Sequence, residues 1–477
     1  MAFDSGYDIV VVGGGLLGAG IARDAAGRGL SVALFEKEDF GAGAVSQSSR
    51  LALGGLSALG TLDFTRVRED IREREILSQT ASYLVQPQTC LIPFYSHGLL
   101  AQTRLRAGLA LTDALGFDHS LRVHQLLSVG DAQKHAPGLR RDGLLGAALV
   151  WETAVPQIER LTQALAFDAR RHGAVLHTHT LVEELCRQSS RQGRERVGGV
   201  RWKDRLTGEI GQAAASLVIV AAGSGQLSLC GGEQMPGQYV KTISLIGPVL
   251  PGLGDVLVFP HEDDPALLLA VPRPEGCWIG SLSTDYDGHS EAAYATGAEA
   301  AALIEAICVY LPGLDMSAVS RAQSAVHAQV LPDQEVTDLA ANGGRCDGLV
   351  TASGAGITRF RRIAEEAVDL ACRKLGRALS VPPCRTASTP LPVPKPRPGE
   401  TIEAAVGHAV AEEECRTLRD FLERRAPQSW TAEDRHAQMP LVLKALAERL
   451  GWNSDRQAAE VKAWDAEIAL GQAFRVL

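Results

Sequence analysis

Three glycines and one acid near the start of the chain have the types and spacing that bind a dinucleotide. Gly13, Gly15 and Gly18 occupy the glycine positions of the pattern G-x-G-x-x-G, and Glu36 follows downstream. The first glycine permits a tight turn, the second lets a pyrophosphate approach the backbone, and the third lets a helix pack closely on a strand. The acid accepts hydrogen bonds from a ribose diol. The four residues therefore predict a site for the phosphates and one ribose of a dinucleotide.

These residues need a strand, a helix and a second strand to position them, and the sequence predicts all three. Residues 9–12 form an apolar run typical of a buried parallel strand, 16–29 form a helix, and 30–35 form the second strand. The helix N-terminus would then face the phosphates with free N–H groups and a positive dipole end. Glycines that only make a turn are the alternative. The agreement of strand, helix, second strand and acid favours the nucleotide site.

Length, composition and charge indicate a globular chain of two or three domains. The chain has 477 residues, 45% of them hydrophobic and 22% charged, which is near the average for globular proteins. Its net charge of −9, with no basic block, argues against nucleic acid as a partner. The nine cysteines show no C-x-x-C pair and no metal-ligand spacing, so we expect reduced, mostly buried thiols and no metal site.

The location of the protein is predicted from what the N-terminus and the apolar runs lack. The first residues, MAFDSGYD, lead directly into the first expected strand and leave no room for a secretory signal. No apolar run reaches the roughly 18 residues of a membrane-spanning helix. We therefore expect a cytoplasmic protein whose only membrane contact would be peripheral, on the inner face. The segment HGLLAQTRLRAGLALTDALG from His97 is one candidate for that contact, but a helix packed on the domain is favoured.

The rest of the chain continues the alternation of strands and helices. We expect helices at 54–84, 157–172 and 358–374, strands at 174–179, 217–222 and 348–352, a hairpin at 198–202 and 209–213, and short strands such as 266–271 and 277–282 between 240 and 330. This α/β pattern predicts a discontinuous nucleotide domain of residues 1–80, 150–235 and 340–380. A mixed or antiparallel sheet, from 81–149 and 236–339, would form a substrate or cap domain. A proline-rich linker at 390–400 would lead to a helical domain at 401–477.

Several segments, taken in order, resemble the FAD-dependent glycerol-3-phosphate dehydrogenases, a group within the glycine/D-amino-acid oxidase-like flavoproteins. They are VVGGGLLGAGIARDAAGRGLSVALFEKEDF, SQSSRLALGGLSAL, REDIREREIL, VIVAAG, SGAGITRFRRIAEEA and LAERLGWNSDRQAAEVKAW. The resemblance implies bound FAD in a Rossmann-like domain of the glutathione-reductase type, with a mixed-sheet substrate domain and a helical C-terminal domain. It also implies oxidation of a secondary alcohol to a ketone.

The resemblance further implies the residues and partners of a flavin site. The partners would be a small-molecule substrate and a quinone acceptor at the membrane surface, and a homodimer is a further candidate. Fifteen residues are expected to bind the cofactor: Gly13, Gly14, Gly15, Gly18, Glu36, Lys37, Ser48, Ser49, Leu51, Val182, Ala222, Gly223, Gly354, Ile357 and Thr358.

The resemblance is weaker at the positions expected to bind the substrate. The family pattern S-S-K-L-I-H-G-G-L-R-Y-L becomes SSRLALGGLSAL, so Arg50 replaces a lysine, Leu53 a histidine, Ser57 an arginine and Ala58 a tyrosine. His327 replaces a second arginine, and the last flavin loop lacks a lysine. A phosphate dianion taken out of water needs fixed cations. The loss of at least three does not support the binding of glycerol 3-phosphate in the family's manner.

His327 and Lys241 are the candidates for catalysis. A neutral imidazole can accept a proton near pH 7, so His327 is the best candidate for the base, although it could also only fill the space of the lost arginine. Lys241 matches a family lysine, with a surface lysine as the alternative. Arg50, Arg359 and Arg361 could form a relocated anion site or simply be ion-paired.

The sequence thus favours an FAD oxidoreductase of unknown substrate. A flavin-binding regulatory or interaction module is the second hypothesis. An NAD-dependent dehydrogenase is a weaker third.

Overall fold

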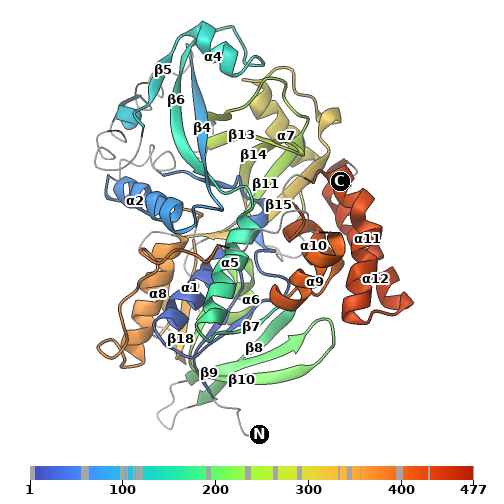
Figure 1. Ribbon diagram of the computed structural model, residues 1–477. Coiled ribbons are helices and arrows are strands. Elements are labelled where there is room, and N and C mark those ends of the chain that lie inside the picture. Colours follow the sequence, from blue (N-terminus) through green and yellow to red (C-terminus); the bar gives the residue numbers. More distant parts are fainter. Residues whose placement is uncertain are drawn as a thin grey trace.

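The protein folds into three parts, which Figure 1 shows as a lower α/β body, an upper sheet and a group of C-terminal helices beside them. The computed structural model describes residues 6–54, 64–96, 103, 106–110, 113, 122–189, 195–230, 238–260, 267–286, 293–330, 334–340, 346–354, 356–393, 401–427 and 430–475. Among these residues, no helix is both long enough and apolar enough to cross a bilayer. Ser57 and Ala58 and most of the segment from His97 lie outside the described residues.

The lower body is built on a sheet, called here the nucleotide sheet, with the first predicted strand at its centre. β1 (Tyr7–Val12) pairs in parallel with β2 (Val32–Phe35) and β10 (Ile210–Val220). The strand order is β16-β18-β10-β1-β2-β7, with β7 (Val175–His177), β16 (Val336–Asp338) and β18 (Leu349–Ala352). Strands buried on both faces read as continuous apolar runs. The structure therefore confirms the strands expected near 9–12, 30–35, 217–222 and 348–352.

One strand differs from its prediction. The hairpin strand expected at 209–213 and the buried strand expected at 217–222 form a single strand, β10. Its first half pairs antiparallel with β9 (Glu195–Asp204), and its second half pairs in parallel with β1 and β18. Within β10 the hydrophobic pattern changes from alternating to continuously apolar where the strand enters the buried sheet. In the sequence, this change looks like the end of one strand and the start of another. β8 (Thr180–Ser189) extends the hairpin to three strands and was not predicted.

Three helices pack together on the nucleotide sheet, and a fourth lies against them. α1 (Leu16–Gly27) contacts α5 (Ile158–Arg171) and α8 (Phe360–Lys374), and α2 (Phe64–Thr80) occupies part of the range predicted as helical from 54 to 84. α1 ends before Gly29, whose φ of +84° turns the chain toward β2. The predicted helices at 16–29, 157–172 and 358–374 are confirmed.

The upper sheet, called here the cap sheet, is a mixed sheet. β12 pairs with β4 in parallel, and the other strand pairs of this sheet are antiparallel. Its strand order is β15-β11-β14-β13-β12-β4-β6-β3. The strands are β3 (Leu51–Ala52), β4 (Gln86–Tyr95), β6 (Leu144–Ala154), β11 (Gln238–Gly247), β12 (Val256–Pro260), β13 (Leu267–Arg273), β14 (Gly276–Asp285) and β15 (Arg321–Gln329). Strands near 266–271 and 277–282 are therefore confirmed, as β13 and β14.

Smaller elements border the cap sheet and the nucleotide sheet. β5 (Gln125–Leu127) pairs with β6, and α7 (Gly297–Cys308) packs against β11 and β14. The others are the 3-10 turn η1 (Ala44–Gln47), α4 (Val129–His135), α6 (Gln226–Cys230) and β17 (Cys346–Asp347).

The C-terminal helices have a core of their own, as the sequence predicts. They are α9 (Ile402–Glu412), α10 (Leu418–Arg424), α11 (Ala432–Leu450) and α12 (Ser454–Gln472). Val406, Phe421, Leu422 and Leu446 are buried at their centre. Thr417 and Thr431 begin α10 and α11 with capping boxes, which satisfy N–H groups that would otherwise lack partners.

Candidate functional site

The glycine loop after β1 is shaped by close packing at two positions and left open at a third. A Cβ on Gly13, whose φ is +106°, would lie 2.5 Å from the carbonyl oxygen of Ala221, and a Cβ on Gly18 would lie 1.8 Å from that of Gly13. A Cβ on Gly15 would meet no atom within 4 Å. Packing therefore requires glycine at the first and third positions. At the second, the open space is what a ligand would fill.

The N-terminus of α1 faces this open space without a side-chain cap. Gly15 is the N-cap residue, no side chain accepts a hydrogen bond from the first turn, and the first turn contains no acid. The first N–H groups of a helix need partners, and the helix dipole adds positive potential there. A pyrophosphate would supply both the acceptors and the charge.

Glu36 is held at the carboxyl end of β2 by two backbone N–H groups. Gly14 N donates to its Oε2 at 2.6 Å and Glu38 N donates to its Oε1 at 2.9 Å. Burial raises the pKa of Glu36, and the two backbone hydrogen bonds oppose that shift. The carboxylate is thus fixed beside the glycine loop, with lone pairs left to accept from a ribose diol.

The loop that follows η1 is anchored through Arg50. Arg50 has a φ of 63°, and its guanidinium donates to the carbonyl of Pro156 at 2.6 Å and to Glu159 at 2.8 Å. Ser48 Oγ donates to the carbonyl of Val45 at 2.8 Å and accepts from Arg50 N at 3.3 Å. Ser49 is half-buried and Leu51 is buried at the start of β3.

Two further loops carry predicted cofactor residues, and a residue that sequence reasoning missed joins them. Gln226 is fully buried, and its Nε2 donates at 2.8 Å both to Val220 O at the end of β10 and to Ala352 O at the end of β18. Its Oε1 accepts from Ser353 Oγ at 2.7 Å. These bonds hold together the loops that contain Ala222, Gly223, Gly354, Ile357 and Thr358.

The remaining predicted cofactor residues, Lys37 and Val182, are on the segment after β2 and on β8. Lys37 follows Glu36 directly and is half-buried. Val182 is buried on β8, opposite Trp202 of β9. Phe35, at the end of β2, stacks on His177 with ring centroids 4.5 Å apart. The predicted residues are therefore distributed over the carboxyl ends of β1, β2, β10 and β18, the adjoining β8, and the loop that leads from η1 into β3.

The two candidates for catalysis lie on opposite faces of the cap sheet. In the register of β11 and β15, Val240 is opposite His327 and Lys241 is opposite Val326, and successive residues of a strand point to opposite faces. His327 is exposed, while the protein around it lowers its pKa by desolvation. With its pKa lowered below the ordinary histidine value, the ring is neutral at pH 7.

Lys241 has a structural partner on the other face. Its Nζ lies 2.5 Å from Glu299 of α7, the helix that covers this side of the cap sheet, and it also donates to the carbonyl of Tyr294 at 3.4 Å. The structure does not bring Lys241 together with His327. Gln323 lies four residues before His327 on β15 and therefore shares its face of the sheet. The buried Oε1 of Gln323 has no hydrogen-bond partner among the described residues.

Two of the three arginines considered for a relocated anion site lie at the start of α8 and form ion pairs there. Arg359 donates to both carboxylate oxygens of Glu335, at 3.1 and 2.6 Å. Arg361 donates to both oxygens of Glu73 at 2.6 Å. With Arg50 on Glu159, each of the three arginines has a carboxylate partner. Ion pairing, the alternative stated above, is what the structure contains.

A fourth arginine, Arg273 at the end of β13, was missed by sequence reasoning. Its Nη2 donates to the carbonyl of Ser48 at 2.8 Å, and its guanidinium carbon lies 5.4 Å from the centre of the Trp278 ring. No carboxylate of the described residues lies within 4 Å of it. Burial, and next the charge of Arg50, lower the pKa of Arg273 to about 9, so it remains a cation at pH 7. The one sequence signal for Arg273 is its position at the end of one of the expected short strands.

Comparison with known proteins agrees with this geometry. A family model described as FAD dependent oxidoreductase matches residues 8–370. The chain belongs to the FAD-dependent oxidoreductases. It is 31% identical to a glycerol-3-phosphate dehydrogenase of Synechocystis over 422 residues, covering 82% of this chain and 74% of that protein. It is 28% identical to an aerobic glycerol-3-phosphate dehydrogenase of Staphylococcus haemolyticus, covering 81% and 71%.

Solved structures show the same fold. The glycerol-3-phosphate dehydrogenase of Bacillus halodurans, complexed with FAD, superposes with a TM-score of 0.76 at 21% identity, covering 98% of this chain and 95% of that one. A glycine oxidase of Geobacillus kaustophilus superposes with a TM-score of 0.59 at 20% identity, covering 82% and 99%. The predicted fold class and family are confirmed.

FAD is the cofactor of this oxidoreductase, and the described residues fit it. The open position at Gly15 and the uncapped N-terminus of α1 would receive the pyrophosphate, and Glu36 would hold a ribose. The loops tied together by Gln226 and the loop that contains Ser48 would hold the flavin part. Among the described residues, no group of three or more His, Cys, Asp or Glu side chains is placed to hold a metal ion.

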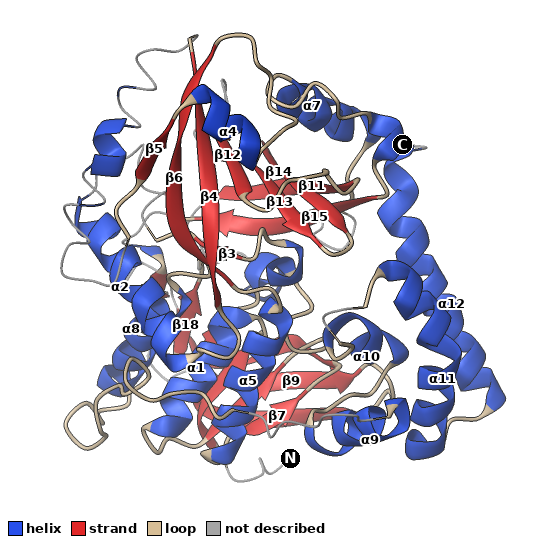
Figure 2. Cartoon of the chain, turned by 45° about the horizontal axis from the view of Figure 1, so that its top comes forward, coloured by secondary structure: helices blue, strands red, loops and turns tan. Residues whose placement is uncertain are grey.

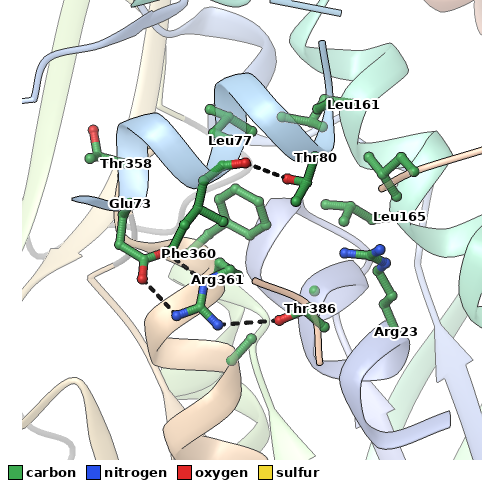
Figure 3. Close-up of a pocket in the computed structure, with 15 residues that line it drawn as sticks. Arg23, Glu73, Leu77, Thr80, Leu161, Leu165, Thr358, Phe360, Arg361 and Thr386 are labelled. Atoms are coloured by element: carbon green, nitrogen blue, oxygen red, sulfur yellow. Dashed lines mark hydrogen bonds and ion pairs between the residues drawn. The ribbon is translucent and has the colours of Figure 1, made fainter. Parts of the chain in front are cut away.

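The oxidoreductase also has a cavity between α1, α2, α5 and α8, but it is not a substrate site. Its volume is about 20 Å³, which is room for about one water molecule. Figure 3 shows the side chains around it, with Arg361 bonded to Glu73 and Thr386, and Leu161 and Leu165 on the opposite wall. The cavity is therefore too small to hold a substrate.

Proposed function

We propose that this oxidoreductase converts a small secondary alcohol into a ketone, and that glycerol 3-phosphate is not its preferred substrate. The observation that carries the proposal is the contrast between the two sides of the site. The nucleotide loop with Gly15 and Glu36 is intact, whereas Arg50, Arg359 and Arg361 are engaged with carboxylates. The curated relatives are named glycerol-3-phosphate dehydrogenases, which supports a dehydrogenase reaction.

The chemistry divides between cofactor and protein. Bound FAD would supply the acceptor for the hydride that leaves the alcohol carbon. The hydroxyl proton needs a base, and His327 is the proposed one because its lowered pKa leaves its ring neutral at pH 7. His327, Gln323 and Ser244 share one face of the cap sheet, where polar groups could orient the hydroxyl group. Figure 2 shows β11, β14 and β15 of this sheet above the nucleotide domain.

The test begins with the colour of the purified protein. Protein with bound FAD is yellow, and anaerobic addition of a substrate bleaches it. We expect bleaching by a secondary alcohol from a panel of hydroxy acids and polyols, and slower bleaching by glycerol 3-phosphate. Faster bleaching by glycerol 3-phosphate than by every other compound would contradict the proposed substrate preference.

The electron acceptor and the assembly are also proposals. A quinone at a membrane surface is the proposed acceptor, and relatives named aerobic glycerol-3-phosphate dehydrogenases support it. Turnover with a soluble quinone, compared with oxygen consumption, tests the acceptor, and sedimentation with anionic lipid vesicles tests the surface. Light scattering on the purified protein tests whether two copies associate.

A flavin-binding module without catalysis is the second candidate. The ion pairs of Arg50, Arg359 and Arg361 favour it, because each arginine that could have replaced a lost cation already has a partner. Failure of the whole panel to bleach a yellow protein would support this candidate and refute the dehydrogenase.

A further inference from the structure

We propose that Arg273, which reaches from the cap sheet to the carbonyl of Ser48, binds the anionic group of the substrate, and that this group is a carboxylate. The inference rests on the proposed function and deepens it, because it names the class of alcohol as a small hydroxy acid. Arg273 would then determine specificity, and the proposed base His327 would act on the hydroxyl group.

The strand register places Arg273 on the site-facing side of the cap sheet. In the antiparallel pairs β13·β14, β14·β11 and β11·β15, residues directly opposite each other share a face, and every second residue along a strand stays on it. The register puts Arg273, Trp278, Ser244, Gln323 and His327 on this one face, together with Thr242, Ser283, Asp285 and Arg321. The hydrogen bond from Arg273 to Ser48 then joins this face to the loop expected to bind the flavin.

Arg273 has donors left to bind a ligand. A guanidinium carries five N–H groups, and one contact, from Nη2 to Ser48 O, is the hydrogen bond that Arg273 makes with the described residues. Its stacking on Trp278 orients the plane of the guanidinium but uses none of the remaining N–H groups. Arg50, Arg359 and Arg361 differ in this respect, because each already donates to a carboxylate.

The local charge balance favours a carboxylate over a phosphate dianion. Arg50 and Glu159 form an ion pair at 2.8 Å, so their charges cancel and the charge of Arg273 is left over. Glu275, on the turn after β13, lies outside ion-pair distance of Arg273 and offsets part of that charge. One guanidinium matches one carboxylate through two parallel hydrogen bonds, whereas a phosphate dianion carries a second negative charge that Arg273 alone does not balance.

Burial gives an anion a further advantage at this position. The protein around Arg273 disfavours its charged form, as the lowered pKa indicates. A bound anion would supply the opposite charge that the described residues do not place within 4 Å. The interaction would be strong because it forms largely out of water.

The experiment measures anion binding to the FAD-loaded protein without requiring turnover. Acetate, inorganic phosphate and neutral glycerol are titrated separately, and the change in flavin absorbance reports binding. We expect wild-type protein to bind acetate more tightly than phosphate and to show no saturable response to glycerol. Arg273→Gln keeps a donor for the Ser48 carbonyl but removes the charge, and it should weaken acetate binding by about 10- to 100-fold.

Arg122 provides a matched control. Its guanidinium carbon lies 5.8 Å from the centre of the Trp151 ring, and Trp151 packs with the core on the other side of the cap sheet. Arg122→Gln therefore removes an arginine stacked on a tryptophan without touching the proposed site, and acetate affinity should not change. Arg273→Lys keeps the charge but not the two-pronged geometry, and we expect an intermediate loss.

Four results would overturn the inference. They are absence of acetate binding to the wild-type protein, equal acetate affinity of wild type and Arg273→Gln, loss of FAD rather than of acetate binding in Arg273→Gln, and tighter binding of phosphate than of acetate. The last would leave the anion contact but refute the carboxylate. If Arg273→Gln does not fold, equal affinity of Arg273→Lys and wild type would refute the two-pronged contact. Arg273-dependent acetate binding in a protein that no alcohol bleaches would refute only the proposed function.

Discussion

At the scale of single residues, the nucleotide loop separates glycines required by packing from one that leaves room for a ligand. Gly18 sits against the carbonyl of Gly13, so its role is in the fold of the loop itself. Gly15 borders open space and has φ and ψ of −71° and −177°, which any residue can adopt. The two positions should therefore respond differently to the same small side chain.

Alanine at these two glycines tests that distinction. Gly18→Ala forces a Cβ against backbone and should destabilise the protein by about 1–3 kcal/mol or more, whether FAD is present or not. Gly15→Ala should cost the FAD-free protein less than about 1 kcal/mol but weaken FAD binding by about 10-fold or more. Thermal unfolding and FAD titration measure both effects. Gly27→Ala, at a position with nothing within 4 Å, is the control, and unchanged FAD affinity in Gly15→Ala would contradict the assignment.

His327→Ala tests the proposed base. Loss of a positioned base should slow anaerobic flavin reduction by about 10²- to 10⁴-fold with little change in FAD content. A base acts in its deprotonated form, and desolvation by the surrounding protein lowers the pKa of His327. The wild-type rate should therefore rise with pH, with a midpoint below the ordinary histidine pKa of about 6.5, and stay constant at higher pH. Stopped-flow absorbance measures the rate. His172→Ala, at the half-exposed end of α5, is the control, and an unchanged rate in His327→Ala would refute the role.

At the scale of elements, α8 is joined to α2 and to the edge of the nucleotide sheet by arginines. Arg361 bonds both oxygens of Glu73 on α2, and Arg359 bonds both oxygens of Glu335 just before β16. Both acids are buried, with 6% and 3% of their surfaces exposed. The sequence suggested these arginines for anion binding, but in the structure they fix the helix that follows a loop expected to bind the flavin.

Removal of one such arginine should therefore lower stability. Arg361→Met leaves the Glu73 carboxylate buried without its main partner, and we expect a loss of about 3–5 kcal/mol in the free energy of unfolding. Arg362→Met, which removes a neighbouring arginine whose side chain is 39% exposed, should cost less than about 1 kcal/mol. Urea unfolding of both variants measures the difference. Equal losses would show that the buried pair contributes no more than the surface pair.

At the scale of the whole molecule, the C-terminal helices contact both other parts. Arg425, after α10, bonds Asp39 with Nη2 to Oδ1 at 3.0 Å, and His179 Nε2 lies 2.8 Å from Asp420. α12 contacts the outer strand β15 of the cap sheet. Figures 1 and 2 show these helices along one side of both sheets. They can therefore stabilise the relative position of the cap sheet and the nucleotide domain.

The contact at Asp39 also supports the cofactor loop. Asp39 is fully buried and accepts from Phe40 N at 2.9 Å, and a Cβ on Gly14 would lie 2.5 Å from the Phe40 ring. Gly14 in turn donates to Glu36. A continuous set of contacts thus leads from Arg425 in the helical domain to the residue expected to bind the ribose.

Arg425→Met tests whether docking of the helical domain supports FAD binding. The change leaves Asp39 buried without its bidentate partner, so we expect a loss of about 3–5 kcal/mol in stability and a lower FAD content after purification. Lys444→Met, which removes a lysine whose side chain is 75% exposed on α11, should leave both unchanged. The ratio of flavin to protein absorbance measures FAD content. Full FAD content in a destabilised Arg425→Met would separate stability from cofactor binding.

The sequence by itself determined the nucleotide loop, its flanking elements and the helical C-terminal part. Gly13, Gly15, Gly18 and Glu36 lie within one strand, helix and strand unit, whose hydrophobic pattern and turn residues act over short distances along the chain. The same holds for α9 to α12, each of which begins at a residue whose side chain caps the helix. Local preference and final structure agree there, so pattern alone was sufficient.

The tertiary structure alone decided the substrate side of the site. The contacts that matter there join residues far apart in sequence: Gln226 with Ala352, Arg273 with Ser48, and Arg361 with Glu73. Which face Lys241 and His327 occupy depends on the register of β11 against β15, which sequence patterns do not specify. Charge balance and burial arise only when these segments meet. The paired arginines and Arg273 could therefore be told apart only in the folded chain.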